Sequence, residues 1–286
     1  MTKTPSRTGP RTTPQTSREA LQALLHELHL EGLARALDTE LDRAERDAAP
    51  VAEVLQRLLS AQAAFQRERS LAYRVRQARL PWQWTIASFP FAQQPGVNKA
   101  QILGLADLDF VRRHENLVLI GGPGTGKTGI AMGLLREACL NGLRGRFYSA
   151  QALLDELYAS LADRSTTRLL SELSRLQPLC IDELGYLNLK SEQVNAFFRL
   201  MDLRYGRVST ILTTNLDYPQ WYGLFDNKPL VDALLDRLQH RCITIHIDGP
   251  SLRAPGASDA QVATPVTPAV PDARSRPRTR RTSSPE

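Results

Sequence analysis

The stretch Gly121-Gly-Pro-Gly-Thr-Gly-Lys-Thr128 decides the fold of this 286-residue chain. It matches the pattern G-x-x-x-x-G-K-T in full, directly after the apolar residues 116–120 (NLVLI) and before a segment with helical character. A strand, a glycine-rich loop and a helix in this order surround phosphate oxygens with backbone N–H groups and the positive end of a helix dipole. The stretch therefore predicts a phosphate site, in which Lys127 contacts the β- and γ-phosphates and the Thr128 hydroxyl binds Mg²⁺. The residues expected to contact the nucleotide are Gly121, Gly122, Pro123, Gly124, Thr125, Gly126, Lys127, Thr128 and Gly129.

Two acids, Asp182 and Glu183, follow the apolar residues 178–181 (PLCI). Beside a phosphate loop, Asp182 would hold Mg²⁺ and Glu183 would deprotonate the attacking water. This pair favours an ATP hydrolase over a kinase or a GTP switch. The alternative is that the two acids cap the start of the next helix.

Two further polar residues extend the candidate site. Asn215 follows the apolar residues 209–213 (STILT) and could bind the attacking water or the γ-phosphate; the alternative is a turn-forming asparagine. Arg237 lies in an expected helix and could reach the γ-phosphate of a neighbouring subunit, with Arg241 as the next candidate. The alternative for Arg237 is a surface ion pair.

Strands and helices alternate from residue 116 onwards. We expect strands at 116–120, 146–149, 178–181, 209–213 and 242–247, and helices after Thr128 and over 150–161, 194–203 and 230–238. This alternation predicts an α/β domain with a five-stranded parallel sheet covered by helices on both faces. Residues 81–110 are expected to be irregular, and the whole ATPase domain to span 81–249.

Residues 18–80 predict a small helical module, because leucines recur at helical spacing. We expect its apolar stripe, which includes Leu55 and Leu59, to be core packing, with a partner-docking surface as the alternative. The five arginines within residues 67–79 could bind phosphates or form a solvated helix face.

Both ends of the chain are basic and poor in apolar residues. Residues 1–18 hold three arginines and one lysine without an acid, and residues 250–286 hold six arginines against three acids, so the net charge of +6 resides at the ends. We expect 1–17 and 250–286 to be disordered and able to contact nucleic acid. The sequence shows neither a membrane span nor a secretory signal, and its three cysteines have no metal-type spacing. These features favour a cytoplasmic protein.

The chain resembles the IstB-like ATP-binding proteins, which are AAA+ ATPases of bacterial insertion sequences related to the DnaC helicase loaders. The resemblance is carried by GGPGTGKT, LCIDELGYL, RYGRVSTILTTN, ALLDRLQHR and the pair Trp221 and Phe225, and it covers about residues 19–253. It implies a P-loop AAA+ fold without a C-terminal lid domain. By motif match, Lys127 and Thr128 are Walker A, Asp182 and Glu183 are Walker B, Asn215 is sensor 1 and Arg237 is the arginine finger.

The resemblance also implies a function. Such proteins assemble with ATP as homo-oligomers on double-stranded DNA and stimulate a DDE transposase. The chain departs from the family in three places: Gly129 and Ile130 stand where a His-Leu pair is usual, the basic tail is longer, and Arg253 is only a weak sensor-2 candidate.

Two other functions remain open on the sequence. A DnaC-like loader of a replicative helicase has a similar ATPase core, and a transposase gene immediately upstream would favour transposition instead. A non-catalytic DNA scaffold would use ATP only for assembly, which Glu183 argues against. A P-loop kinase is the least favoured, because it gives Asn215 and Arg237 no role.

Overall fold

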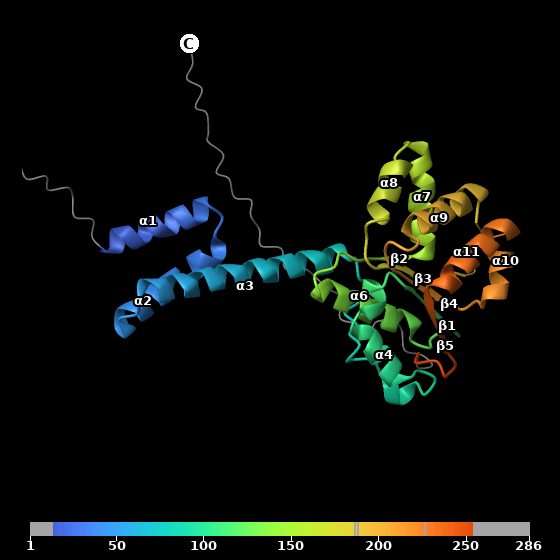
Figure 1. Cartoon of the computed structure of the whole chain (residues 1–286), viewed down its shortest axis with the longest axis horizontal. Coiled ribbons are helices and arrows are strands. Elements are labelled where there is room, and N and C mark those ends of the chain that lie inside the picture. The colour runs from blue at the N-terminus through green and yellow to red at the C-terminus, as the bar shows by residue number, and fades with distance from the viewer. Residues whose placement is uncertain (1–13, 186, 188, 226, 254–286) are drawn as a thin grey trace, which may run out of the picture.

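The computed structural model describes residues 14–185, 187, 189–225 and 227–253. Its N-terminal region is helical. Its helices are α1 (Pro14–Glu27), α2 (Glu31–Asp47) and the long α3 (Val51–Gln77) (Figure 1). Helix α1 begins inside the segment 1–17 that we expected to be disordered. Proline suits a first helical turn, and Arg18 joins α1 to α2 through Asp42 and Glu45, each at 2.6 Å. The rest of that segment lies outside the described residues.

The helical module has a small core between α2 and α3. Leu37, Val54 and Leu58 are buried there. The expectation that the whole leucine stripe is core was wrong, because a 27-residue helix packed on one side by α2 cannot bury a wide face. Among the large apolar residues of α3, those that remain more than half exposed are Val51 (75%), Leu55 (53%), Leu59 (61%) and Tyr73 (53%).

The end of α3 leads into the sheet domain. Arg74 donates from Nε to the Cys139 carbonyl (3.0 Å), and Phe147 donates its N–H to the Ala78 carbonyl (2.8 Å). Residues 81–110 are not irregular throughout, as we had expected. They contain the short η1 (Phe91–Gln93), the helix α4 (Lys99–Ala106) and the start of α5 (Asp109–Arg112). Asn98 caps α4 by accepting from the Gln101 N–H. The apolar side of α4 buries Ile102 and Leu105.

Five parallel strands form the sheet, which confirms the expected fold class. They are β1 (Asn116–Gly121), β2 (Arg146–Ser149), β3 (Leu179–Asp182), β4 (Thr210–Thr214) and β5 (Cys242–Ile247). Their order is β2-β3-β4-β1-β5, so β4 lies between β3 and β1. Since all strands run in one direction, the carboxyl ends of β1, β3 and β4 meet at one edge of the sheet.

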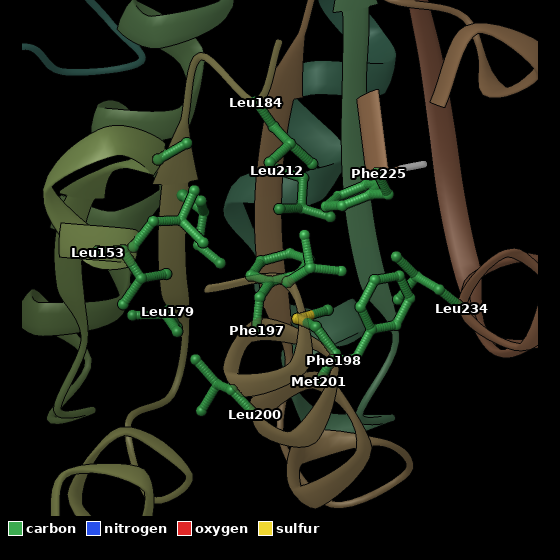
Figure 2. Packing of buried hydrophobic residues seen from close by; sticks show 14 of the residues in the cluster. Leu153, Leu179, Leu184, Phe197, Phe198, Leu200, Met201, Leu212, Phe225 and Leu234 are labelled. Atoms are coloured by element: carbon green, nitrogen blue, oxygen red, sulfur yellow. The ribbon is translucent and has the colours of Figure 1, made fainter. Parts of the chain in front are cut away.

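Helices cover both faces of the sheet, because side chains along each strand alternate between them. Leu117 and Leu119 belong to the core that includes α4 and α6 (Lys127–Leu140), whereas Val118 belongs to the opposite core. Figure 2 shows that opposite core, where Phe197 and Phe225 stack at 5.7 Å between ring centroids. Its helices are α7 (Ala150–Ala162), α8 (Thr166–Leu173), α9 (Ser191–Arg204), α10 (Trp221–Phe225), which follows the short η2 (Tyr218–Gln220), and α11 (Lys228–His240).

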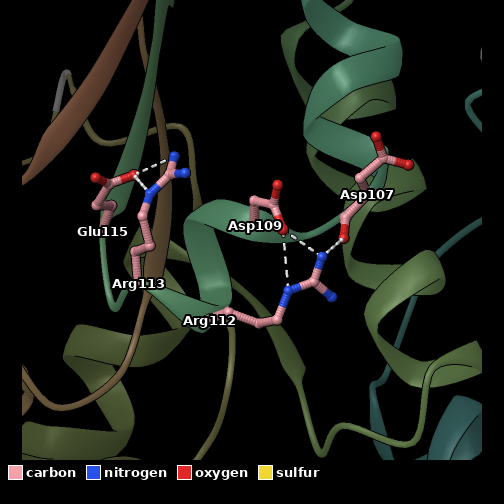
Figure 3. A network of polar contacts seen from close by, with 5 residues as sticks. All are labelled: Asp107, Asp109, Arg112, Arg113 and Glu115. Atoms are coloured by element: carbon pink, nitrogen blue, oxygen red, sulfur yellow. Dashed lines mark hydrogen bonds and ion pairs between the residues drawn. The ribbon is translucent and has the colours of Figure 1, made fainter.

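The start of β1 is fixed mainly by Asn116. Its N–H donates to the Arg241 carbonyl and its Oδ1 accepts from the Thr210 N–H, both at 2.9 Å. The preceding turn carries exposed contacts, in which Arg112 binds Asp109 and the Asp107 carbonyl while Arg113 pairs with Glu115 (Figure 3). Exposed pairs of this kind contribute little, so the buried Asn116 bonds set where β1 begins.

The described part of the chain contains no helix with the length and apolar character needed to cross a bilayer. The expected disorder of 250–286 was wrong for its first residues, because Pro250 accepts from Gln94 and Leu252 donates to the Gly124 carbonyl. The rest of that tail, and the expected lack of a lid domain, concern residues outside those that the structure describes.

Candidate nucleotide site

The phosphate loop leaves the end of β1 and enters α6 at Lys127. Gly124 and Gly126 have φ values of +77° and +94°, a region that favours glycine. Gly121 lies so close to the next strand that a Cβ on it would be 2.5 Å from the Ile247 carbonyl oxygen. The glycines of the motif are therefore required by backbone conformation and by close packing.

Lys127 folds back over this loop. Its Nζ donates to the carbonyls of Gly121 (2.8 Å) and Gly122 (2.6 Å). Burial lowers the pKa of Lys127, while the nearby charges of Asp182 and Glu183 act in the opposite direction. The cation is thus held at the loop by groups that an anionic phosphate could replace.

Thr128 and Asp182 meet across the site. The Thr128 hydroxyl donates to the Asp182 carboxylate, at 2.9 Å from Oδ1 and 3.1 Å from Oδ2. Burial raises the pKa of Asp182, and hydrogen bonds from Thr213 and Thr128 oppose that rise. A hydroxyl and a carboxylate are hard oxygen donors of the kind that Mg²⁺ prefers, so the residues present fit this ion.

Glu183 is exposed at the end of β3 and has a left-handed φ of +59°. The alternative in which Asp182 and Glu183 cap a helix is wrong, because the next helix, α9, begins eight residues later with Lys190 at its N-cap. The carboxylate is therefore available to solvent beside the phosphate loop.

Asn215 directly follows β4 and is half-buried. Its Oδ1 would lie 2.5 Å from a Cβ placed on Gly185, so the side chain faces the segment that follows β3. Because β4 lies between β1 and β3, the fold brings Asn215 to the same edge as Lys127 and Asp182.

Arg237 does not join this group. Its guanidinium pairs with Asp202 at 3.0 Å, and it lines a small cavity with Asn116 and Thr210, the first residues of β1 and β4. The phosphate loop follows the other end of β1, about 16 Å away along a strand of this length. The arginine is therefore out of reach of the phosphate loop of its own chain.

Sequence reasoning missed a layer that covers the outside of the phosphate loop. Leu252, after β5, donates its N–H to the Gly124 carbonyl (2.8 Å). The buried Gln94 donates from Nε2 to the carbonyls of Thr125 (3.2 Å) and Pro250 (2.8 Å). Arg253 lies near enough that its charge adds to the effect of burial in lowering the pKa of Lys127. Nothing local in the sequence marks Gln94, since its partners are 31 and 156 residues away.

Gly129 has a packing reason that explains one departure from the resembling family. A Cβ on Gly129 would lie 3.2 Å from the Trp84 ring, so this ring occupies the space that a larger side chain would need. Gly129 is accordingly buried beneath Trp84.

Known proteins are similar to this chain along most of its length. The model of a family described as IstB-like ATP binding protein matches residues 23–260. An ATP-binding protein of insertion sequence IS21 from Pseudomonas aeruginosa is 35% identical over 252 residues, covering 88% of this chain and 95% of that protein. An ATP-binding protein of insertion sequence IS5376 from Geobacillus stearothermophilus is 31% identical, covering 82% of this chain and 94% of that protein.

Solved structures share the fold. The DnaC helicase loader superposes with a TM-score of 0.51 at 22% identity, covering 59% of this chain and 99% of that one. DnaI superposes with a TM-score of 0.50 at 18% identity, covering 58% of this chain and 91% of that one.

Proposed function

This chain belongs to the IstB-like ATP-binding proteins, and from that membership we propose that it is a Mg²⁺-dependent ATPase that assembles on double-stranded DNA and stimulates the transposase of its insertion sequence. The observation that carries the proposal is the convergence of the phosphate loop, Asp182, Glu183 and Asn215 at one edge of the sheet. A site built only to bind ATP has no need of an exposed carboxylate at that point.

The residues divide the work of hydrolysis. Lys127 would bind the β- and γ-phosphates, and Asn215 would orient the attacking water. Glu183 would take the proton from that water while the water oxygen bonds to the γ-phosphorus. The bond between the γ-phosphorus and the oxygen that bridges it to the β-phosphate breaks, which releases ADP and phosphate. Thr128 and Asp182 would hold Mg²⁺, which neutralises developing charge on the phosphate oxygens when it is bound.

Assembly is supported by the position of Arg237. Since this arginine is remote from the phosphate loop of its own chain, it can contact a γ-phosphate only in a neighbouring subunit. The exposed apolar side chains Leu55 and Leu59 on α3 further support protein–protein contact by the helical module.

Contact with DNA is supported by α3. Arg67, Arg69 and Arg76 are exposed, and none of them pairs with an acid among the residues that the structure describes. Arg69 and Arg76 lie over the rings of Phe65 and Tyr73. Guanidinium groups along one helix that pair with no acid are suited to bind the phosphates of DNA. A helix face that is merely solvated gives these groups no binding partner.

The partner is proposed from the relatives. The proteins that match along 94–95% of their own length are named for insertion sequences, whereas the likeness to the DnaC helicase loader shows only the fold. This favours a transposase over a replicative helicase.

Phosphate release by the purified full chain tests the proposal. We expect release that requires Mg²⁺ and rises with double-stranded DNA, and a loss of about tenfold or more in Asp182→Asn. Asp109→Asn is the matched control, because it changes an exposed aspartate far from the phosphate loop in the same way. A wild-type chain that binds ATP on DNA but releases no phosphate would support the non-catalytic scaffold instead.

A further inference from the structure

Thr213 is a buried threonine on β4 that contacts both acids at the end of β3. Its Oγ1 lies 2.5 Å from Asp182 Oδ1 and 2.9 Å from the backbone nitrogen of Glu183. The side chain is completely buried, so no water competes for these bonds. No motif assigns this residue, since it lies two positions before Asn215 within the apolar run of the strand.

The direction of both bonds is determined by chemistry. The Glu183 N–H can only donate, so the Thr213 oxygen must accept from it. The same hydroxyl has one hydrogen left, which it donates to the Asp182 carboxylate. One hydroxyl therefore fixes the side chain of the first acid and the backbone of the second.

The backbone of Glu183 needs such support. A φ of +59° is uncommon for a residue with a side chain and persists only where the surroundings hold it. The neighbouring segment is tied to β4 as well: Leu184 donates its N–H to the Thr213 carbonyl at 2.9 Å, and Thr214 donates its hydroxyl to the Leu184 carbonyl at 2.5 Å. The strand that ends in Asn215 thus clamps the turn that presents Glu183.

We propose that Thr213 is a positioning residue, whose hydroxyl holds Asp182 and Glu183 in the arrangement that ATP hydrolysis requires while contributing little to ATP binding. The inference rests on the proposed ATPase function. The Thr213 side chain connects β4, the strand before Asn215, directly to Asp182 and Glu183, without the nucleotide between them.

The test compares variants of the full chain. Thr213→Val keeps the shape of the side chain and removes the hydroxyl, whereas Thr213→Ser keeps the hydroxyl. Thr210→Val is the matched control, because it removes another buried hydroxyl from the same strand at the opposite end, where that oxygen accepts from Arg204. Thr213→Ala replaces the valine variant if valine prevents folding.

Two measurements are made on each variant. We expect Thr213→Val to lower kcat at least about tenfold while the ATP affinity from calorimetry changes less than about threefold, and Thr213→Ser and Thr210→Val to stay near wild type. In the nucleotide-free protein, amide hydrogen exchange should be faster at Glu183 in Thr213→Val alone.

A wild-type kcat with wild-type exchange in Thr213→Val would overturn the inference, and so would a serine variant as impaired as the valine variant. A wild-type chain without phosphate release would instead contradict the proposed function. In that case faster exchange at Glu183 still supports the role of Thr213 in holding the two acids, and unchanged exchange overturns it.

Discussion

Replacing Arg237 by alanine separates a surface ion pair from an arginine that acts on a neighbouring subunit. Arg237 and Asp202 are 38% and 58% exposed, so their pair contributes under about 1 kcal/mol to folding. Arg237→Ala and Asp202→Ala should therefore unfold at nearly the temperature of the wild type. Only Arg237→Ala should lose ATP hydrolysis, by about ten- to a thousandfold, since an arginine that stabilises γ-phosphate charge is worth this much or more.

Mixing two inactive variants tests whether the arginine acts between subunits. Lys127→Ala should fail to bind ATP but still present Arg237, whereas Arg237→Ala should bind ATP and lack the arginine. In a random equal mixture about one quarter of the interfaces pair an intact phosphate loop with an intact arginine, so turnover should return to about a quarter of the wild-type rate.

The assay is phosphate release at protein concentrations where the wild type assembles, with ATP binding measured in parallel. No recovery in the mixture, with each variant still assembling, would refute the reasoning from the position of Arg237. Full activity of Arg237→Ala alone would refute it as well and would make Arg241 the next residue to replace.

Glu183→Gln should bind ATP with wild-type affinity in calorimetry and release phosphate at least about a hundredfold more slowly, because an amide cannot accept the proton of the attacking water. Turnover at the parental rate would show that Glu183 is not the base. DNA affinity should fall as salt rises, and replacing Arg67, Arg69 and Arg76 by glutamine should reduce the slope of log affinity against log salt by about 2–3. Deleting residues 254–286 removes five arginines and three acids and should reduce the slope less. An unchanged slope in the α3 variant would place the DNA contact elsewhere.

The sequence predicted the parts of the site that depend on neighbouring residues. The phosphate loop could be located because the glycine-rich stretch that leads to Lys127 and Thr128 follows an apolar strand directly, and the same local rule located Asp182 at the end of β3 and Asn215 after β4. Every expected strand was found within about one residue of its observed bounds.

Contacts between distant segments could not be predicted in this way. The order of the strands places β4 beside β3, and only that order brings the Thr213 hydroxyl to Asp182, 31 residues earlier. The helix α4 was missed because the aromatic and proline residues before it dominate the pattern, while its cap, Asn98, is a single residue. Burial of the α3 leucines was overestimated because spacing shows which side chains share a face but not whether another element covers it.

The long helix α3 has the geometry of a lever arm. Its 27 residues span about 40 Å, with one end resting on α6, the helix that begins at Lys127, and the other end carrying α1 and α2. A tilt of about 5° at the α6 contact would sweep the far end through about 3–4 Å, close to the rise of one base pair of DNA. Small rearrangements around a bound phosphate would thereby be converted into displacements comparable with the spacing of base pairs in a DNA duplex.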